Sequence, residues 1–297
     1  MDKNIFAGLE DLGFDNVEDF QIFGKKEEKK DDAAEKKEED PRTLLYDQTV
    51  KCPVCNNVFK ARSVKTSAYR VDKKDSDFFI RYTLINPYFY DVWLCDSCGY
   101  AAMKADFEKI RDSQSELVMQ KITPKWQGKN YPDLYDINIA IERYKIALLN
   151  YVITDAKASK KSMACLKIAW MYRLLEDTKN EQLFLKQSLE GFISAFENES
   201  FPLYGMDKFT SMYLIAELYR RVGNSDGALL WFGRVLTDPI ANQKIKELSR
   251  DQKDIIQAEQ AEEKHKLKEE IKSSPETKKT EAPAEPKKNG LFSKFFK

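Results

Sequence analysis

Four of the five cysteines in this chain form two Cys-x-x-Cys pairs, Cys52 with Cys55 and Cys95 with Cys98. Each pair falls on a predicted tight turn, where two thiolates three positions apart can bind one edge of a metal tetrahedron and backbone N–H groups can point at the sulfurs. The pattern therefore predicts a single four-cysteine site, most typical of one structural Zn2+ ion. The 39 residues between the pairs exceed the usual spacing, so the metal would join segments that are far apart in sequence.

A zinc ion held by four thiolates is coordinatively closed and offers no position for an activated water molecule. The sequence supplies no other catalytic set, because it contains neither a phosphate-binding glycine loop nor a nucleophile motif. The single histidine, His265, lies in a run of polar residues that predicts a solvated helix face. We therefore expect a non-enzymatic protein in which zinc is structural.

Two alternatives stay open. The cysteines could instead belong to a redox protein, either by binding Fe, as in rubredoxin-like proteins, or by acting as thiols without a metal, and colour would separate iron from zinc. The segment between the pairs carries seven aromatic residues within positions 78–93, interleaved with lysines and arginines, a combination that can bind single-stranded nucleic acid. We favour the interpretation that these aromatics form a small core, because Lys plus Arg equals Asp plus Glu at 49 each.

The elements that would position the cysteines are short strands. Alternation predicts strands over 46–51 and 58–62 around the first pair, and over 90–94 leading into the second pair. A strand, a knuckle and a second strand, repeated twice, is the plan of a zinc ribbon.

After the second pair the hydrophobic period becomes helical. An amphipathic helix is predicted over 107–122, and residues 136–249 are helical by pattern, with breaks near 154–160, 177–180, 198–205 and 223–226. In 212–239, small and large residues fall where a tetratricopeptide repeat places them, with Ala216 and Ala228 as the small contacts and Phe232 as the large one. Two to three divergent helical hairpins are expected, and Cys165 should be a buried core residue.

Helical hairpins of this type stack so that a concave face binds a peptide. The residues expected to face that groove, and to bind a protein or peptide partner, are Trp170, Arg173, Tyr213, Glu217 and Arg220. The alternative interpretation is that these helices simply pack on the metal module.

The two ends of the sequence are expected to be tethers. Residues 1–24 predict a short amphipathic segment, and the following run of lysines and acids predicts a solvated linker. Residues 250–272 predict a polar helix, and 273–297 a disordered tail. In that tail Leu291, Phe292, Phe295 and Phe296 would share one helical face and dock on a protein groove or an anionic membrane surface.

Composition places the chain in a broad class. Hydrophobic residues make up 42% of the 297 residues, enough to bury a core, and no apolar run is long enough to span a membrane. The amino terminus has no secretory apolar region, and paired cysteine motifs suit a reducing compartment better than a disulfide framework. We expect a cytoplasmic protein.

A set of short motifs with a particular spacing resembles the bacterial domain-of-unknown-function family 2225. The motifs are Tyr46-Asp47, Cys52-Pro53-Val54-Cys55, Asp75-Ser76-Asp77-Phe78, Asn86-Pro87, Tyr90 and Cys95-Asp96-Ser97-Cys98-Gly99-Tyr100-Ala101. The resemblance covers roughly 45–249 and implies a split four-cysteine ribbon with tetratricopeptide-like helices, a metal, and no assigned activity. Two positions depart from the pattern: Asn56 stands where a knuckle often has glycine, and Phe79 where many members carry another cysteine.

These observations predict an α+β protein, with a small zinc-ribbon-like β module followed by an all-α helical-hairpin domain and disordered charged linkers at both ends. The expected boundaries are 1–24, 25–42, 43–103, 104–249, 250–272 and 273–297. The expected function is that of a metal-stabilised scaffold or adaptor.

Overall fold

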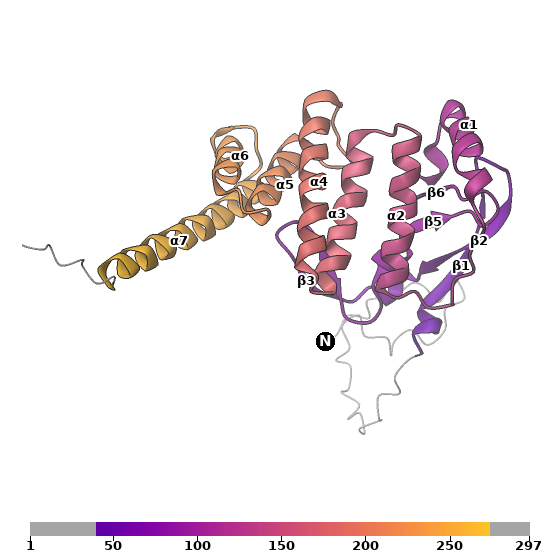
Figure 1. Cartoon of the computed structure of the whole chain (residues 1–297), viewed down its shortest axis with the longest axis horizontal. Coiled ribbons are helices and arrows are strands. Elements are labelled where there is room, and N and C mark those ends of the chain that lie inside the picture. Colours follow the sequence, from indigo (N-terminus) through magenta and orange to yellow (C-terminus); the bar gives the residue numbers. More distant parts are fainter. Residues whose placement is uncertain (1–39, 274–297) are drawn as a thin grey trace, which may run out of the picture. The chain divides into compact units, whose positions relative to one another are not determined.

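The structure, a computed structural model, describes residues 40–273 (Figure 1). Those residues form an α+β protein, with the strands in the first part and helices in the second, as the sequence predicts. The predicted segment 1–24, the linker up to residue 39 and the tail with Leu291, Phe292, Phe295 and Phe296 lie outside the described residues.

The β module consists of three antiparallel hairpins of two strands each. Their strands are β1 (Leu45–Lys51) with β2 (Val58–Val64), β3 (Val71–Lys74) with β4 (Ile80–Tyr82), and β5 (Val92–Leu94) with β6 (Ala101–Met103). The first and third hairpins each enclose one cysteine pair, so the predicted strand, knuckle and strand plan is confirmed for both pairs. Tyr90 is not part of the third hairpin, because it ends a short 3-10 helix, Pro87–Tyr90.

Seven α-helices follow within the described residues. They are α1 (Asp112–Lys121), α2 (Ile137–Ile153), α3 (Ala158–Leu174), α4 (Thr178–Asn198), α5 (Lys208–Arg221), α6 (Ser225–Thr237) and α7 (Gln243–Ser273). All four predicted breaks are confirmed. A fifth break, at 238–242, was not predicted, and the boundary expected at 249/250 is wrong because it falls inside α7. The helix expected from 107 begins only at Asp112, after a 3-10 turn.

Most helix starts are fixed by a local side-chain cap. The acidic or amide residue before the helix accepts a hydrogen bond from the third backbone N–H, as Asp136 does from Ile139 at 2.8 Å. The same arrangement begins α4, α5 and α6, at Asp177, Asp207 and Asn224. Helix α3 has no such cap at Lys157, and Glu199 from the end of α4 accepts the Ser159 N–H instead, at 3.0 Å.

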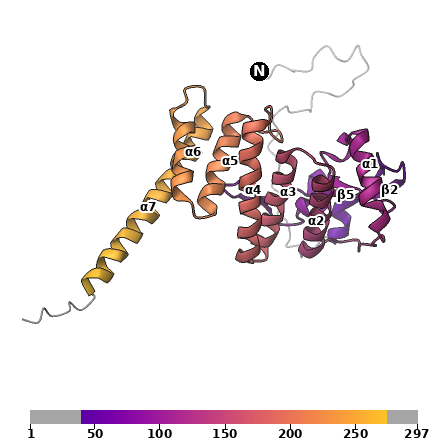
Figure 2. The ribbon, with the colours of Figure 1, turned by 45° about the horizontal axis from the view of Figure 1, so that its top comes forward.

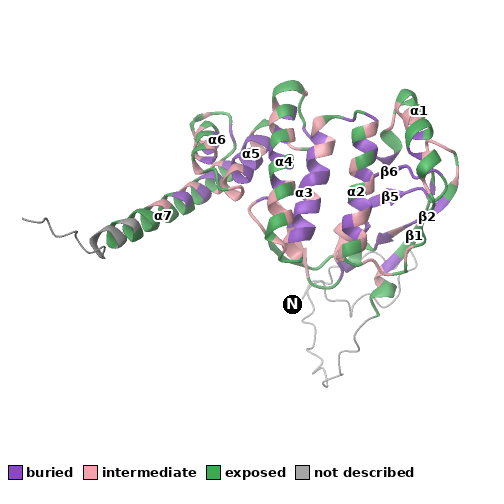
Figure 3. Cartoon of the chain, in the orientation of Figure 1, coloured by how far each residue is buried: buried purple, intermediate pink, exposed green. Residues whose placement is uncertain are grey.

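The helices pack on one another in chain order, and Figure 2 shows α2 to α6 as a row. Helix α2 contacts β5 and β6, so it joins the strands to this row. One hydrophobic cluster runs from Val50 in β1 to Ile256 in α7. The boundary expected at 103/104 therefore separates strands from helices, but it does not divide two cores. Helix α3 lies between α2 and α4 and is largely buried (Figure 3).

The predicted repeat contacts are used as packing contacts. Ala216, Ala228 and Phe232 are all fully buried where α5 packs on α6. Cys165 is buried in α3, as predicted. Within the described part of the chain, no helix is long and apolar enough to cross a membrane.

Candidate metal centre

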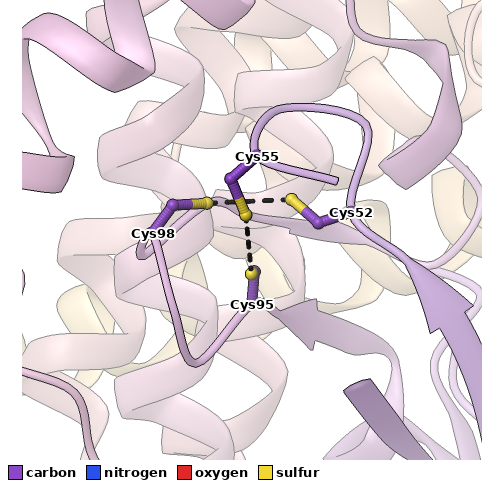
Figure 4. Close-up of side chains that lie close together, drawn as sticks. All are labelled: Cys52, Cys55, Cys95 and Cys98. Atoms are coloured by element: carbon purple, nitrogen blue, oxygen red, sulfur yellow. Dashed lines mark hydrogen bonds between the residues drawn. The ribbon is translucent and has the colours of Figure 1, made fainter. Parts of the chain in front are cut away.

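The four predicted cysteine ligands meet at one point, although they come from two hairpins that are distant in sequence. Cys52 and Cys55 lie on the turn between β1 and β2, and Cys95 and Cys98 on the turn between β5 and β6. Figure 4 shows the four side chains pointing toward one another from these two loops. The sequence prediction of a single shared site is confirmed as a geometric cluster.

The two knuckles have the same backbone geometry. In the first, the N–H of Cys52 donates to the Asn57 carbonyl at 2.8 Å, and that of Asn56 donates to the Cys52 carbonyl at 3.0 Å. In the second, Cys95 donates to Tyr100 at 2.8 Å and Gly99 to Cys95 at 3.0 Å. Asn56 has φ 62° and Gly99 has φ 75°, so both turns end in a left-handed residue. Asparagine tolerates that conformation better than most residues do, which explains how Asn56 replaces a glycine.

The distances between the sulfurs fit a metal tetrahedron. The Sγ atoms of Cys52 and Cys98 lie 3.7 Å apart, those of Cys55 and Cys95 lie 3.6 Å apart, and all four lie within 4.8 Å of one another. A zinc–sulfur bond of about 2.3 Å requires tetrahedron edges of roughly 3.8 Å. A disulfide would need about 2.05 Å. The cluster therefore has the spacing of a four-coordinate metal site, and the donor set fits zinc.

The close packing of the cysteine side chains shifts the pKa values of Cys52, Cys95 and Cys98. Hydrogen bonds from the neighbouring thiols of Cys52 and Cys98 lower the pKa of Cys95 to about 2. Hydrogen bonding with Cys95, together with burial, raises the pKa of Cys52 to about 12, and hydrogen bonds to Cys52 and Cys95 also raise the pKa of Cys98. One sulfur is thus stabilised as a thiolate by the others. A dication at the centre would favour all four thiolates, so its binding must release protons.

Side chains outside the cysteines hold the second knuckle in place. Asn57 Nδ2 donates to Asp96 Oδ1 at 2.9 Å, which links the two turns directly. Trp126 Nε1 donates to the Asp96 carbonyl at 2.7 Å, and Asn150 Nδ2 on α2 donates to the Gly99 carbonyl at 3.2 Å. These contacts fix the knuckle on the helical part of the protein.

The five predicted groove residues also converge, but the chain itself fills their groove. We call residues 75–79 the acidic turn; it connects β3 with β4. Trp170 and Arg173 on α3 contact Asp77 of this turn: Trp170 Nε1 donates to Asp77 Oδ2 at 3.0 Å, and Arg173 Nη2 to the same oxygen at 2.7 Å. Asp77 is fully buried.

Helix α5 holds the other side of the acidic turn. Tyr213 donates to the Ser76 carbonyl at 3.0 Å, and the Ser76 hydroxyl donates to Glu217 at 2.6 Å. Arg220 pairs with Glu217 at 2.8 Å. Trp170, Tyr213 and Glu217 are buried, so the expectation of an open peptide groove at these residues is wrong. Their side chains are used to bind the segment that joins the two cysteine pairs.

Sequence reasoning named Asp75 and Asp77 only as part of the family resemblance, and it missed their partners Arg81 and Arg221. Arg221 lies 3.5 Å from Asp77 and 2.7 Å from Glu217, and Arg81 pairs with Asp75 at 2.9 Å. The available signal was the Asp-x-Asp spacing of the acidic turn, set against two adjacent arginines at the end of α5.

The other residues that the sequence singled out lie either in the core or on the surface. Phe79, Tyr90 and Trp93 of the aromatic segment are buried, which favours the core interpretation over a stacking surface for nucleic acid. Phe79 stacks on Trp170 with 5.1 Å between ring centroids. Cys165 is not part of the four-sulfur cluster, and His265 is exposed on α7.

The fold and the site define a class of protein in which a four-cysteine double knuckle shares one core with helical hairpins. The family model described as "Uncharacterized protein conserved in bacteria (DUF2225)" matches residues 45–256, and the chain belongs to this family. The match includes all four cysteines, the acidic turn and both helices that bind it. Searches of curated proteins and of solved structures gave no match.

Proposed function

We propose that this protein is a non-enzymatic adaptor, in which one zinc ion held by the four cysteines fixes the β module on the helices. The observation that carries the proposal is the four-sulfur cluster, because four thiolates close the coordination sphere of zinc to substrate and water. The ion then contributes folding energy rather than chemistry. Reduced cysteines suit a cytoplasmic protein.

Iron is the second candidate, and it would make the protein a rubredoxin-like redox protein. The backbone N–H groups of Val54 and Cys55 hydrogen-bond to Cys52, and those of Ser97 and Cys98 hydrogen-bond to Cys95. Such bonds stabilise thiolates on either metal and also tune the potential of iron sites. The embedding of both knuckles in the helical core favours the structural role.

Metal analysis separates the two candidates. The full chain is purified anaerobically without added metal, and its metal content and visible absorbance are measured. One zinc per chain and no colour is the expected result. One iron per chain with visible absorbance would replace the adaptor proposal by the redox one, and metal-free protein would contradict both.

The partner surface that we propose is the shallow groove between α2 and α3, with a volume of about 530 Å³. Ile141, Ile146 and Tyr172 line it, and Leu149 beside them is 53% exposed. Lys145 donates to the Tyr172 hydroxyl at 2.8 Å, and Glu142 pairs with Lys129, so the charges at this groove already have partners. The groove therefore suits a peptide of a partner protein that inserts one large apolar side chain. We also propose residues 290–297 as a second docking element, which would bind a protein groove or a membrane surface.

Site-specific crosslinking tests this surface. A photoreactive residue replaces Leu149 in the cell, and the same residue replaces Leu230, which is 56% exposed on α6, as the matched control. We expect an adduct with one protein at position 149 only. The binding of that purified protein is then compared between the wild type and Leu149→Lys, and a loss of at least tenfold is expected. Equal binding by the variant would contradict the proposed surface, and a parallel deletion of residues 290–297 shows whether the tail contributes.

A further inference from the structure

A second cavity, of about 630 Å³, lies beside the second knuckle and is bordered by α1, α2, α3 and α4. Its volume lies in the range of small-molecule sites, about 300–1,000 Å³. The ring of Tyr100, which directly follows the second cysteine pair, forms part of the wall together with Ile110 and Tyr151. These partly apolar walls come from both the β module and the helices.

The buried polar groups on this wall are mostly satisfied by one another. Tyr151 donates to Asp106 at 3.1 Å, and Lys160 pairs with the same carboxylate at 3.0 Å. The Ser159 hydroxyl donates to Glu199 at 2.7 Å. The carboxylates of Asp106 and Glu199 are thus already compensated by a cation and by the start of α3, respectively.

One buried polar atom on the wall has no partner. Asn150 is 1% exposed, and its Nδ2 donates to the Gly99 and Ile146 carbonyls. Its Oδ1 is buried without any hydrogen bond among the described residues. This oxygen has almost no accessible surface, so it is not a ligand contact, and the groups left for ligand recognition are the cations of the cavity.

The cavity also carries an excess of positive charge. Five of its lining residues are cationic: Lys109, Arg111, Lys157, Lys160 and Lys161. Three are acidic, and each has a partner: Asp106 and Glu199 as described above, and Asp155 with Lys161 at 3.6 Å. Lys109, Arg111 and Lys157 form no ion pair with the described residues, so three cations are left for a ligand.

We propose that this cavity binds a phosphate monoester whose carbon frame has the size of a sugar or a nucleoside, the chemistry shared by sugar phosphates and nucleoside monophosphates. The phosphate, which bears close to two negative charges at neutral pH, pairs with Lys109, Arg111 and Lys157. The carbon frame packs against Ile110, Tyr100 and Tyr151, on the apolar part of the wall. A bare phosphate ion would leave most of the cavity unused.

Calorimetric titration of the full-length, metal-loaded protein tests the site with five probes. Ribose 5-phosphate and adenosine 5′-monophosphate represent the two sources of this chemistry. Methyl phosphate and inorganic phosphate lack the large carbon frame, and succinate carries two negative charges without phosphate. We expect binding of at least one of the first two, at least tenfold tighter than that of the other three. The tighter of the two identifies the source.

Two double variants test the location. Lys109→Gln with Lys157→Gln removes two of the free cations of the cavity, and we expect it to weaken binding at least tenfold. Lys179→Gln with Lys186→Gln removes the same charge from exposed positions on α4 outside the cavity, and it should leave the affinity unchanged. Absence of binding by both larger esters, equal binding of methyl phosphate or succinate, or equal losses in the two double variants would overturn the proposal.

Discussion

Asp77 and Arg173 are 96 residues apart in sequence and form a two-point ion pair, with 2.7 Å from Nη2 to Oδ2 and 3.1 Å from Nη1 to Oδ1. Asp77 lies between the two cysteine pairs, and Arg173 lies near the end of α3. The carboxylate is fully buried and Arg173 is nearly so. The segment that links the two metal knuckles is therefore also the segment that locks the β module onto α3 and α5.

Replacing Asp77 by asparagine should strongly destabilise the fold. The variant leaves Arg173 and Arg221 without the buried carboxylate, and breaking a buried pair in this way costs roughly 3–5 kcal/mol. The free energy of unfolding in urea measures the loss. Asp47→Asn is the matched control, since Asp47 pairs with Arg62 at an exposed site and should cost about 1 kcal/mol or less. Similar losses in both variants would contradict the central role of Asp77.

The same ion pair predicts a pH dependence. Burial alone would raise the pKa of Asp77, but the hydrogen bond and charge of Arg173, the charge of Arg221 and the Trp170 hydrogen bond lower it below the ordinary value of 3.8. A lowered pKa in the folded state stabilises the protein above pH 3.8, and that contribution is lost as the pH falls through the folded-state value. Urea unfolding between pH 3 and pH 7 should show a smaller acid loss for Asp77→Asn than for the wild type. Parallel pH profiles would exclude Asp77 as a source of the dependence.

Removal of one metal ligand should destabilise the fold, whereas the cysteine outside the cluster, Cys165, should be dispensable for metal binding. Cys95→Ser is expected to lose the metal and to lower the melting temperature by 10 °C or more, since roughly 3 kcal/mol shifts a domain of this size by about that much. Cys165→Ala, a buried cysteine outside the cluster, should keep one metal per chain and lose only about 1 kcal/mol. Melting and metal analysis are measured on the same preparations. Unchanged melting of Cys95→Ser would show that the metal does not support the fold.

The left-handed residues of the two knuckles should respond differently to alanine. Asn56→Ala places an alanine at φ 62° and should cost about 1 kcal/mol, whereas Asn56→Gly should be nearly neutral. Gly99→Ala adds a collision to the same strain, because its Cβ would lie 2.8 Å from the Trp126 ring. Urea unfolding of the metal-loaded variants should therefore rank Gly99→Ala as the most damaging. Equal costs for both alanine variants would mean that the Trp126 contact relaxes freely.

The sequence allowed the cysteine cluster and most helix boundaries to be predicted, because both depend on local signals. Cys-x-x-Cys turns and capping residues such as Asp207 act within a few positions of one another. The tertiary contacts of the acidic turn could not be predicted from such local signals. Asp75 and Asp77 resemble solvated charges in sequence, and their burial depends on Arg173 and Arg221, which reach them only through the tertiary fold. The groove residues were correctly grouped, but nothing local indicates that the chain's own segment occupies their groove.

The long separation between Ser76 and its partner Glu217, 141 residues, has a consequence for synthesis on the ribosome. All four cysteines emerge well before α5 does, so a metal-bound double knuckle can form while the helix that receives the acidic turn is still unmade. At bacterial elongation rates of about 5–20 residues per second, that interval is roughly 5–25 seconds. During this time the metal closes the loop that contains the acidic turn, whereas α5, which binds this turn, has not yet been synthesised. Early metal binding thus gives the nascent chain a preformed half of its final long-range contact.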